Sequence, residues 1–372
     1  MKINRIDVFY CNTPFKNGFH SPHIFRISAE SIIVNIQFDN YVSGYGESTP
    51  RSYVTGENTE SVAAVIRDHF SLLLLGREIA SVNDIEKLLY VLEEECRANN
   101  ISSYLSALGA VDIALLDGLS KTLGIPLSSL LGPIVREKIT YTIPIPLLPI
   151  DVIREMPKYL AGTEFSSIKV LMKELVAENI ERLRLIRSIF GLNMEVSVEA
   201  NGKWTYQQAI ENLNKLKEFN ITAVEQPVHS SDLRGLKKIR EITGIPVMVD
   251  ESMCTLSDAE LLIESGACDM LNIKISKCGG LLKSKKIADF ALSRGVRFQL
   301  GAHVGETDIL KRAGQNLALV SPNLIHSEGF SSLLFEDMRD GGQNSVEAAH
   351  SIVNIDNQLL KKIHSVNLES TL

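Results

Sequence analysis

The sequence lacks the features that would place a protein outside the cell, in a membrane or on nucleic acid. Its most apolar stretch, Leu72 to Leu75, is far too short to span a bilayer. The first ten residues alternate apolar and polar side chains like a strand and contain no long apolar core of a signal peptide. The net charge is −7 and the isoelectric point about 5.7, which argues against a broad phosphate-binding surface. We therefore expect a cytoplasmic protein that binds neither membrane nor nucleic acid.

Cysteine pairs and several common catalytic motifs are also missing. The five cysteines are odd in number and form no C-x-x-C pair, so the sequence indicates neither a disulfide framework nor a zinc site. There is no P-loop, no dinucleotide-binding glycine fingerprint after a strand, no H-E-x-x-H and no nucleophile elbow. Hydrophobic residues make up 45% of the chain, which is enough for a large core and a second folding unit.

The N-terminal third of the chain changes from a strand pattern to a helix pattern. Residues 1–50 read as strands and hairpins. From Glu60 to about Gly124 the period becomes helical, and a run of small residues around Ala107 and Ala110 suits close packing. We expect an α+β domain over residues 1–125.

A repeated strand–helix pattern follows Pro126. Short apolar strands recur about every 23–28 residues, a spacing typical of βα units, and eight such strands close a barrel over residues 126–328. The helix near Asp258 is expected to open with a capping box from Ser257 to Glu260. The expected strands are 139–145, 167–172, 194–199, 222–225, 247–250, 270–274, 297–300 and 323–327.

Polar and charged side chains stand at the C-terminal ends of seven of these strands, where a barrel of this kind builds its active site. So many polar strand ends are hard to explain by packing. In chain order they are Lys169, Glu199, Glu225, Asp250, Lys274, His303 and Glu328.

Three of these side chains predict a metal site. Glu199, Glu225 and Asp250 end three consecutive apolar strands, and carboxylates brought so close would repel each other unless a cation lay between them. Hard oxygen ligands select Mg²⁺ or Mn²⁺. The alternative for each carboxylate alone is that it caps a helix or pairs with Lys or Arg around the barrel opening.

Lys274 and His303 are the candidate proton-transfer groups. A lysine beside a metal in a barrel opening can have its pKa lowered enough to act as a general base, although it could instead only neutralise a ligand carboxylate. His303 follows the seventh strand, and a lone histidine is more often structural than catalytic. Lys277, one turn beyond Lys274, is expected at the surface or at a helix terminus.

Taken together, these residues resemble the enolase superfamily, specifically its mandelate racemase and muconate lactonizing enzyme group. The motifs that carry the resemblance span nearly the whole chain. They are Gly44-Tyr-Gly-Glu-Ser-Thr-Pro50, Tyr53-Val-Thr-Gly-Glu57, Ala110-Val-Asp-Ile-Ala-Leu-Leu-Asp117, Gly124-Ile-Pro-Leu-Ser-Ser-Leu-Leu-Gly132, Glu225-Gln-Pro, Asp250-Glu-Ser and Lys274-x-x-Lys-x-Gly-Gly. A lysine at position 274 is closer to the muconate lactonizing branch.

The resemblance implies a fold and a reaction. The fold is a modified TIM (β/α)7β barrel with an α+β capping domain, to which the C-terminal segment 329–372 returns. In the shared partial reaction a base removes the proton α to a carboxylate, and Mg²⁺ stabilises the resulting ene-diolate. The resemblance also implies a homo-oligomer and a small carboxylate substrate, which loops of the capping domain help to recognise. The candidate substrate-binding residues are Arg51, Tyr53, Asn201, Glu306 and Glu328.

The chain departs from the family pattern at two positions. The third-strand ligand is usually aspartate, and here it is the longer Glu199. The second strand usually carries Lys-x-Lys, and here it reads Lys169-Val-Leu171, so the second lysine is missing. Lys169 remains as a group that could hold the substrate carboxylate.

These observations favour a metal-dependent isomerase or lyase in which Lys274 is the only base, as in cycloisomerisation or dehydration. Two alternatives stay open. The chain could be a degenerate family member that binds metal or a carboxylate without turnover, or an epimerase or racemase that uses a non-standard second base such as His303.

Overall fold

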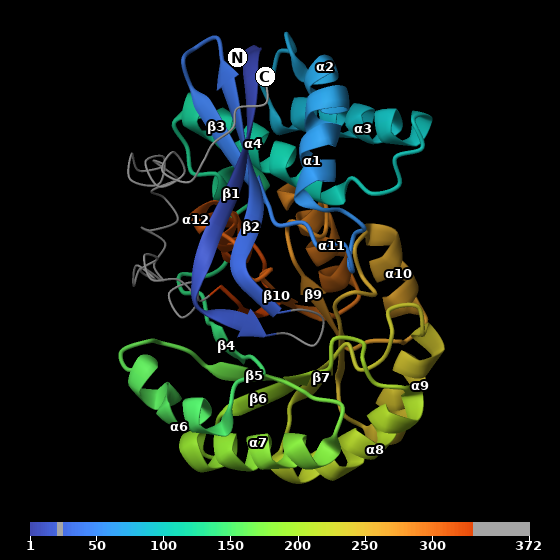
Figure 1. Ribbon diagram of the computed structural model, residues 1–372. Helices are drawn as coiled ribbons and strands as arrows, with labels where there is room; N and C mark the ends of the chain where they lie inside the picture. Colours follow the sequence, from blue (N-terminus) through green and yellow to red (C-terminus); the bar gives the residue numbers. More distant parts are fainter. Residues whose placement is uncertain (21–24, 330–372) are drawn as a thin grey trace.

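The structure is a computed structural model that describes residues 1–20 and 25–329 of the 372-residue chain. It contains a small N-terminal α+β unit and a parallel β-barrel ringed by helices (Figure 1). Within the described residues no helix is both long and apolar enough to cross a membrane. All but the first residue of the expected C-terminal segment lies outside the described residues.

The N-terminal unit is built on an antiparallel sheet in the order β1-β2-β3. The central strand buries Ile32, Val34 and Ile36 completely, and Val34 pairs with Val8 on the neighbouring strand. The strands are β1 (Ile3–His20), β2 (Phe25–Phe38) and β3 (Ser43–Ser48). In Figure 1 the long β1–β2 hairpin extends from the N-terminal unit toward the barrel.

Helices cover this sheet, and one of them packs unusually close to it. A methyl group added to Gly46 on β3 would lie 1.8 Å from the carbonyl oxygen of Ala110 on α4, so only glycine fits there. The expectation of a close-packing, small-residue helix is confirmed. The helical segments of this part of the chain are α1 (Thr59–Val65), the π-helix η1 (Ile66–Phe70), α2 (Ser71–Leu74), α3 (Val82–Ala98), α4 (Leu105–Leu123) and α5 (Ser128–Leu131).

The barrel has eight parallel strands in sequence order, β4 to β11, and a bridge between Tyr141 and Ser327 joins its first and last strands. The strands are β4 (Thr142–Ile145), β5 (Ser167–Leu171), β6 (Glu195–Glu199), β7 (Ala223–Glu225), β8 (Val247–Val249), β9 (Met270–Ile273), β10 (Arg297–Leu300) and β11 (Leu324–Ser327). All eight expected strands are present. The first is shorter than expected, because Tyr141 makes only the isolated bridge to Ser327.

Helices follow the barrel strands as the sequence predicted. They are α6 (Ile150–Tyr159), α7 (Val176–Phe190), α8 (Tyr206–Leu216), the 3₁₀ turn η2 (Lys217–Phe219), α9 (Leu233–Thr243), α10 (Leu256–Glu264), α11 (Leu281–Ser293) and α12 (Asp308–Leu319). The expected capping box of α10 was misplaced by two residues. Thr255 is the residue with extended backbone, and its hydroxyl accepts from the Asp258 backbone N–H, whereas Ser257 already lies within the helix.

Two buried carboxylates of the N-terminal unit join it to the barrel. Glu47 accepts hydrogen bonds from the backbone N–H groups of Thr307 and Leu310, at the start of α12. Asp112 on α4 accepts from the backbone N–H groups of Leu281 and Leu282, at the start of α11. Each carboxylate therefore satisfies helix N–H groups that have no partner inside their own helix.

Candidate active site

The carboxylates predicted to bind a metal come together at the C-terminal ends of β6, β7 and β8, which we call the mouth of the barrel. One oxygen each from Glu199, Glu225 and Asp250 lies within 4.8 Å of the other two. All three residues are at most 5% exposed. Parallel strands bring their carboxyl ends to one edge of the barrel, so side chains distant in sequence meet there.

Lys169 connects the carboxylate cluster to the last strand of the barrel. Its Nζ lies 2.9 Å from Glu199, 3.1 Å from Glu225 and 2.6 Å from Glu328. Burial opposes protonation of Lys169, but the three carboxylates outweigh it and hold the pKa of this lysine well above its ordinary value. Lys169 therefore stays protonated, and its ammonium group is held among these three carboxylates.

Asp250 is paired with two lysines. Lys274 donates to Oδ2 at 2.6 Å, and Lys277 donates to Oδ1 at 2.8 Å. Burial alone would raise the pKa of Asp250, but the two ammonium groups hold it well below its ordinary range. Asp250 therefore stays ionised, the state in which a carboxylate can bind a cation.

The ion pair with Asp250 also determines the pKa of Lys274. Burial alone would lower that pKa, but the ion pair with Asp250 is stronger and raises it above its ordinary value. The expected lowering applies to a lysine beside a bound metal and stays a prediction.

Lys277 does not lie at the surface as expected. Its side chain is completely buried and donates to Asp250 and to the backbone carbonyl of Asn272. Sequence reasoning missed this residue because its partner Asp250 comes from the preceding strand of the barrel.

The donor set fits a divalent cation. Within the described residues, four carboxylates, those of Glu199, Glu225, Asp250 and Glu328, form ion pairs with three ammonium groups, those of Lys169, Lys274 and Lys277, so the ion-paired cluster keeps an excess of negative charge. Burial and the charge of Glu199 raise the pKa of Glu225 to about 7. A cation with hard, oxygen-preferring coordination would remove this repulsion.

His303 is held in one tautomer beside the site. Its Nδ1 lies 2.9 Å from the backbone carbonyl of Thr49, and a carbonyl can only accept, so Nδ1 carries the proton. The other ring nitrogen, Nε2, is buried and has no hydrogen-bond partner among the described residues. Burial and the nearby charges of Lys274 and Arg51 hold the pKa of His303 well below its ordinary value, so the ring is neutral.

The candidate substrate-binding residues differ in what they contact. Arg51 is 4% exposed, and its terminal nitrogens donate to the carbonyls of Pro50 and Val304, so it ties the N-terminal unit to the loop after β10. Asn201 donates to the carboxylate of Glu199. Tyr53 is 46% exposed and is the candidate most open to solvent.

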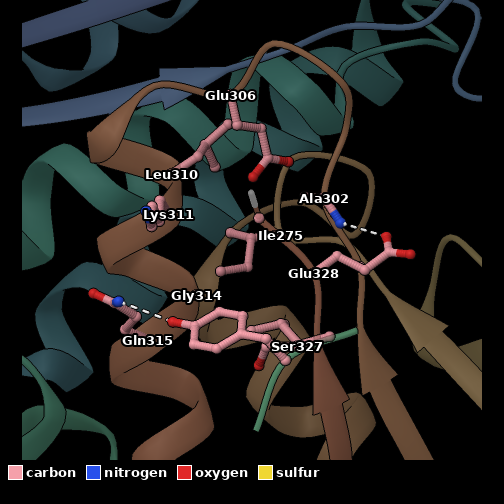
Figure 2. A pocket seen from close by; sticks show the side chains of 13 residues that line it. Ile275, Ala302, Glu306, Leu310, Lys311, Gly314, Gln315, Ser327 and Glu328 are labelled. Carbon is pink, nitrogen blue, oxygen red and sulfur yellow. Dashed lines mark hydrogen bonds between the residues drawn. The ribbon is translucent and has the colours of Figure 1, made fainter. Parts of the chain in front are cut away.

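Glu306 and Glu328 lie on either side of a small cavity between the mouth and α12 (Figure 2). Glu306 accepts from the backbone N–H of His303, and Glu328 accepts from that of Ala302. Burial raises the pKa of Glu306 to about 8. The cavity measures about 20 Å³, which is the room that one water molecule needs, so it is too small for a substrate.

Leu171 stands where the family pattern has its second lysine. It is 5% exposed, pairs in register with Glu199 and faces the same side of β5 as Lys169, two residues earlier. An aliphatic side chain thus lies beside the carboxylate cluster where a proton carrier would otherwise stand.

Sequence reasoning also missed two polar neighbours of the cluster. Asn272 is completely buried and donates to Glu225 at 2.6 Å. Glu251 follows Asp250 directly, and burial raises its pKa to about 8. The signal for Asn272 was its position two residues before Lys274 in the expected strand 270–274, which puts both side chains on one face of that strand.

Comparisons with known proteins identify the family of this chain. Residues 5–132 match the family described as mandelate racemase / muconate lactonizing enzyme, N-terminal domain, and residues 151–354 match the family described as enolase C-terminal domain-like. The L-Ala-D/L-Glu epimerase of Bacillus subtilis (strain 168) is 30% identical over 92% of this chain and 92% of its own length. The hydrophobic dipeptide epimerase of Enterococcus faecalis is 30% identical over 94% of this chain and 96% of its own length.

Solved structures are similar as well. The dipeptide epimerase of Enterococcus faecalis V583, complexed with Mg and the dipeptide L-Leu-L-Tyr, has a TM-score of 0.82 at 28% identity, covering 90% of this chain and 92% of that one. The N-succinyl Arg/Lys racemase of Bacillus cereus has a TM-score of 0.83 at 28% identity, covering 90% and 89%. With both family regions matched and the carboxylate cluster in the barrel mouth, this chain belongs to the mandelate racemase / muconate lactonizing enzyme group of the enolase superfamily.

Proposed function

We propose that the protein is a Mg²⁺-dependent isomerase or lyase that removes the proton α to the carboxylate of a small, amino-acid-derived substrate. The observation that carries the proposal is the pairing of Lys274 with Asp250, one of three buried carboxylates with closely spaced oxygens. Relatives named as epimerases or racemases of dipeptides and N-succinyl amino acids support the substrate class. When bound, the cation would supply positive charge that offsets the charge developing on the substrate carboxylate.

In this proposal each lysine of the mouth has a separate task. Lys274 removes the α-proton, and a cation held by Asp250 would make it a better base, because it would weaken the ion pair that raises the pKa of Lys274. Lys169 remains protonated through Glu328 and contributes a fixed positive charge for the substrate carboxylate. Glu199, Glu225 and Asp250 would hold the cation.

Leu171 favours chemistry on one face of the substrate. Inversion at the α-carbon needs one group to remove a proton and another to return it from the opposite face. Because Leu171 cannot carry a proton, we propose that proton exchange occurs with retention from the Lys274 side, as in cycloisomerisation or elimination.

Epimerisation or racemisation is the second candidate function, and His303 is the observation that favours it. Its Nε2 is buried, unprotonated and without a hydrogen-bond partner among the described residues. A neutral imidazole in that state can accept a proton. Under this alternative His303 replaces the missing lysine as the second base.

Deuterium exchange tests the proposal and separates the two candidates. The Mg²⁺-loaded protein is incubated in D₂O with a panel of dipeptides and N-succinyl amino acids, and mass spectrometry and chiral chromatography follow the products. Deuterium at the α-carbon without the antipode supports single-base chemistry. Deuterated antipode formed as fast as the exchange, and lost in His303→Gln, would instead establish a two-base epimerase.

Two controls complete the experiment. Leu171→Lys adds a lysine on the other side and should bring antipode formation to any substrate that the wild type exchanges with retention. Absence of exchange across the whole panel, by protein shown to bind Mg²⁺, would contradict the proposed function and favour a binding protein without turnover.

A further inference from the structure

Lys277 is buried, and its ammonium group makes three hydrogen bonds within the protein. Its Nζ donates to Asp250 Oδ1 at 2.8 Å, to the Asp250 carbonyl at 2.7 Å and to the Asn272 carbonyl at 2.9 Å. An ammonium group has three N–H donors, so all of them are used. The side chain is 0% exposed, and no room remains for a substrate to reach it.

Lys274 is bound to the same aspartate in a different way. It donates one hydrogen bond, to Asp250 Oδ2 at 2.6 Å, and within the described residues its Nζ has no other hydrogen-bond acceptor. Lys274 can thus leave Asp250 at the loss of a single bond, whereas Lys277 would have to break three. Each of the two lysines therefore contacts a different oxygen of the Asp250 carboxylate.

The contacts of Lys277 extend to a second carboxylate of the cluster. Asn272, whose carbonyl Lys277 holds, donates through its side chain to Glu225 Oε1 at 2.6 Å. Gly301, directly after the adjacent strand β10, allows this packing, because a methyl group there would lie 2.1 Å from the Asn272 side-chain oxygen. Asp250 and Glu225 are therefore connected through Lys277 and Asn272.

We infer that Lys277 is a positioning residue for the cation site. It holds Oδ1 and the backbone carbonyl of Asp250, so that Oδ2 stays turned toward Lys274 and the carboxylate stays beside those of Glu199 and Glu225. Through Asn272 it also fixes the strand that carries Lys274. This inference rests on the proposed function only in that a cation binds at Glu199, Glu225 and Asp250.

The alternative role for Lys277 predicts an effect of opposite sign. If it only neutralised Asp250, its ammonium would compete with an incoming cation, and removing it would tighten cation binding. If it positions Asp250, removing it should weaken binding even though a repelling charge is lost. Loss of residues that orient metal ligands typically weakens metal binding about tenfold to a hundredfold.

Mg²⁺ titration by isothermal calorimetry of four proteins distinguishes the two roles. They are the wild type, Lys277→Met, Lys277→Gln and Lys274→Met. Lys274→Met is the matched control, since it removes the same charge from the same aspartate but breaks only one hydrogen bond. We expect Lys274→Met to bind Mg²⁺ at least as tightly as the wild type, and Lys277→Met to bind it about ten to a hundred times more weakly.

Lys277→Gln covers the case in which Lys277→Met does not fold. Its amide keeps two N–H donors without the charge, and thermal melting in EDTA reports the metal-free fold of every variant. Retained folding with binding between those of the wild type and Lys277→Met supports the positioning role. Unchanged or tighter Mg²⁺ binding by a folded Lys277 variant overturns it, while absence of Mg²⁺ binding by the wild type overturns the cation site itself.

Discussion

At the scale of single residues, the division of work between Lys274 and the carboxylates can be tested directly. Lys274→Ala should eliminate α-proton exchange in D₂O while Mg²⁺ binding is retained, because Lys274 is a partner of Asp250 and not a ligand. Exchange rates from mass spectrometry and Mg²⁺ affinity from calorimetry check the two halves of this prediction. Activity within about tenfold of the wild type, a loss below about 1.4 kcal/mol, would rule out general base catalysis by Lys274.

The sequence allowed the identities of the mouth residues to be predicted but not their pairings. Glu199, Glu225 and Asp250 were recognisable because each ends an apolar strand. Nothing local to Lys277 shows that it is buried, since its burial depends on Asp250, 27 residues earlier. The rise of the Lys274 pKa was likewise unpredictable, because it depends on a distance between two strands.

At the scale of helices and strands, the periodicity of apolar residues predicted which elements exist better than it predicted where each one begins and ends. Seven of the eight barrel strands lie within a residue or so of their expected limits at each end, because apolar runs bounded by polar residues are locally encoded. The start of α10 could not be predicted in the same way, because both Thr255 and Ser257 can act as N-caps and both have an acidic residue three positions later. Only the extended backbone of Thr255 decides between them.

The junction of α4 with α11 gives a prediction on pH and stability. Burial raises the pKa of Asp112 to about 7, above its ordinary value near 3.8. The folded state therefore holds a proton that the unfolded state releases at lower pH, so the contribution of Asp112 to stability falls as pH rises from about 4 to about 7. Asp112→Asn keeps an acceptor for the Leu281 and Leu282 N–H groups and should flatten this fall, as measured by urea unfolding across that range.

Asp112→Ala provides the matched comparison. It removes the acceptor and leaves buried N–H groups of α11 without a partner, which should lower the free energy of unfolding by about 1–3 kcal/mol relative to Asp112→Asn at every pH. Equal stability of the alanine and asparagine variants would show that water replaces the carboxylate at this junction.

At the scale of the whole molecule, cation binding should stabilise the folded protein. A ligand that binds only the folded state at about 100 times its Kd adds about 2.7 kcal/mol, so Mg²⁺ should raise the Tm. Glu225→Gln or Asp250→Asn should abolish the increase, which differential scanning calorimetry with Mg²⁺ or with EDTA measures. A Tm that still responds to Mg²⁺ in both variants would place the cation elsewhere on the protein.

Two carboxylates of the N-terminal unit accept hydrogen bonds from helices of the barrel, and this limits which chimeras of the protein can fold. Glu47 and Asp112 complete the first turns of α12 and α11, so the barrel does not contain all the hydrogen-bond acceptors that its own helices require. A chimera that exchanges N-terminal units between relatives to alter substrate preference must therefore carry acidic residues at both positions. Without these acidic residues, the exchanged unit would bring new recognition loops, but the first N–H groups of α11 and α12 would lose their hydrogen-bond acceptors.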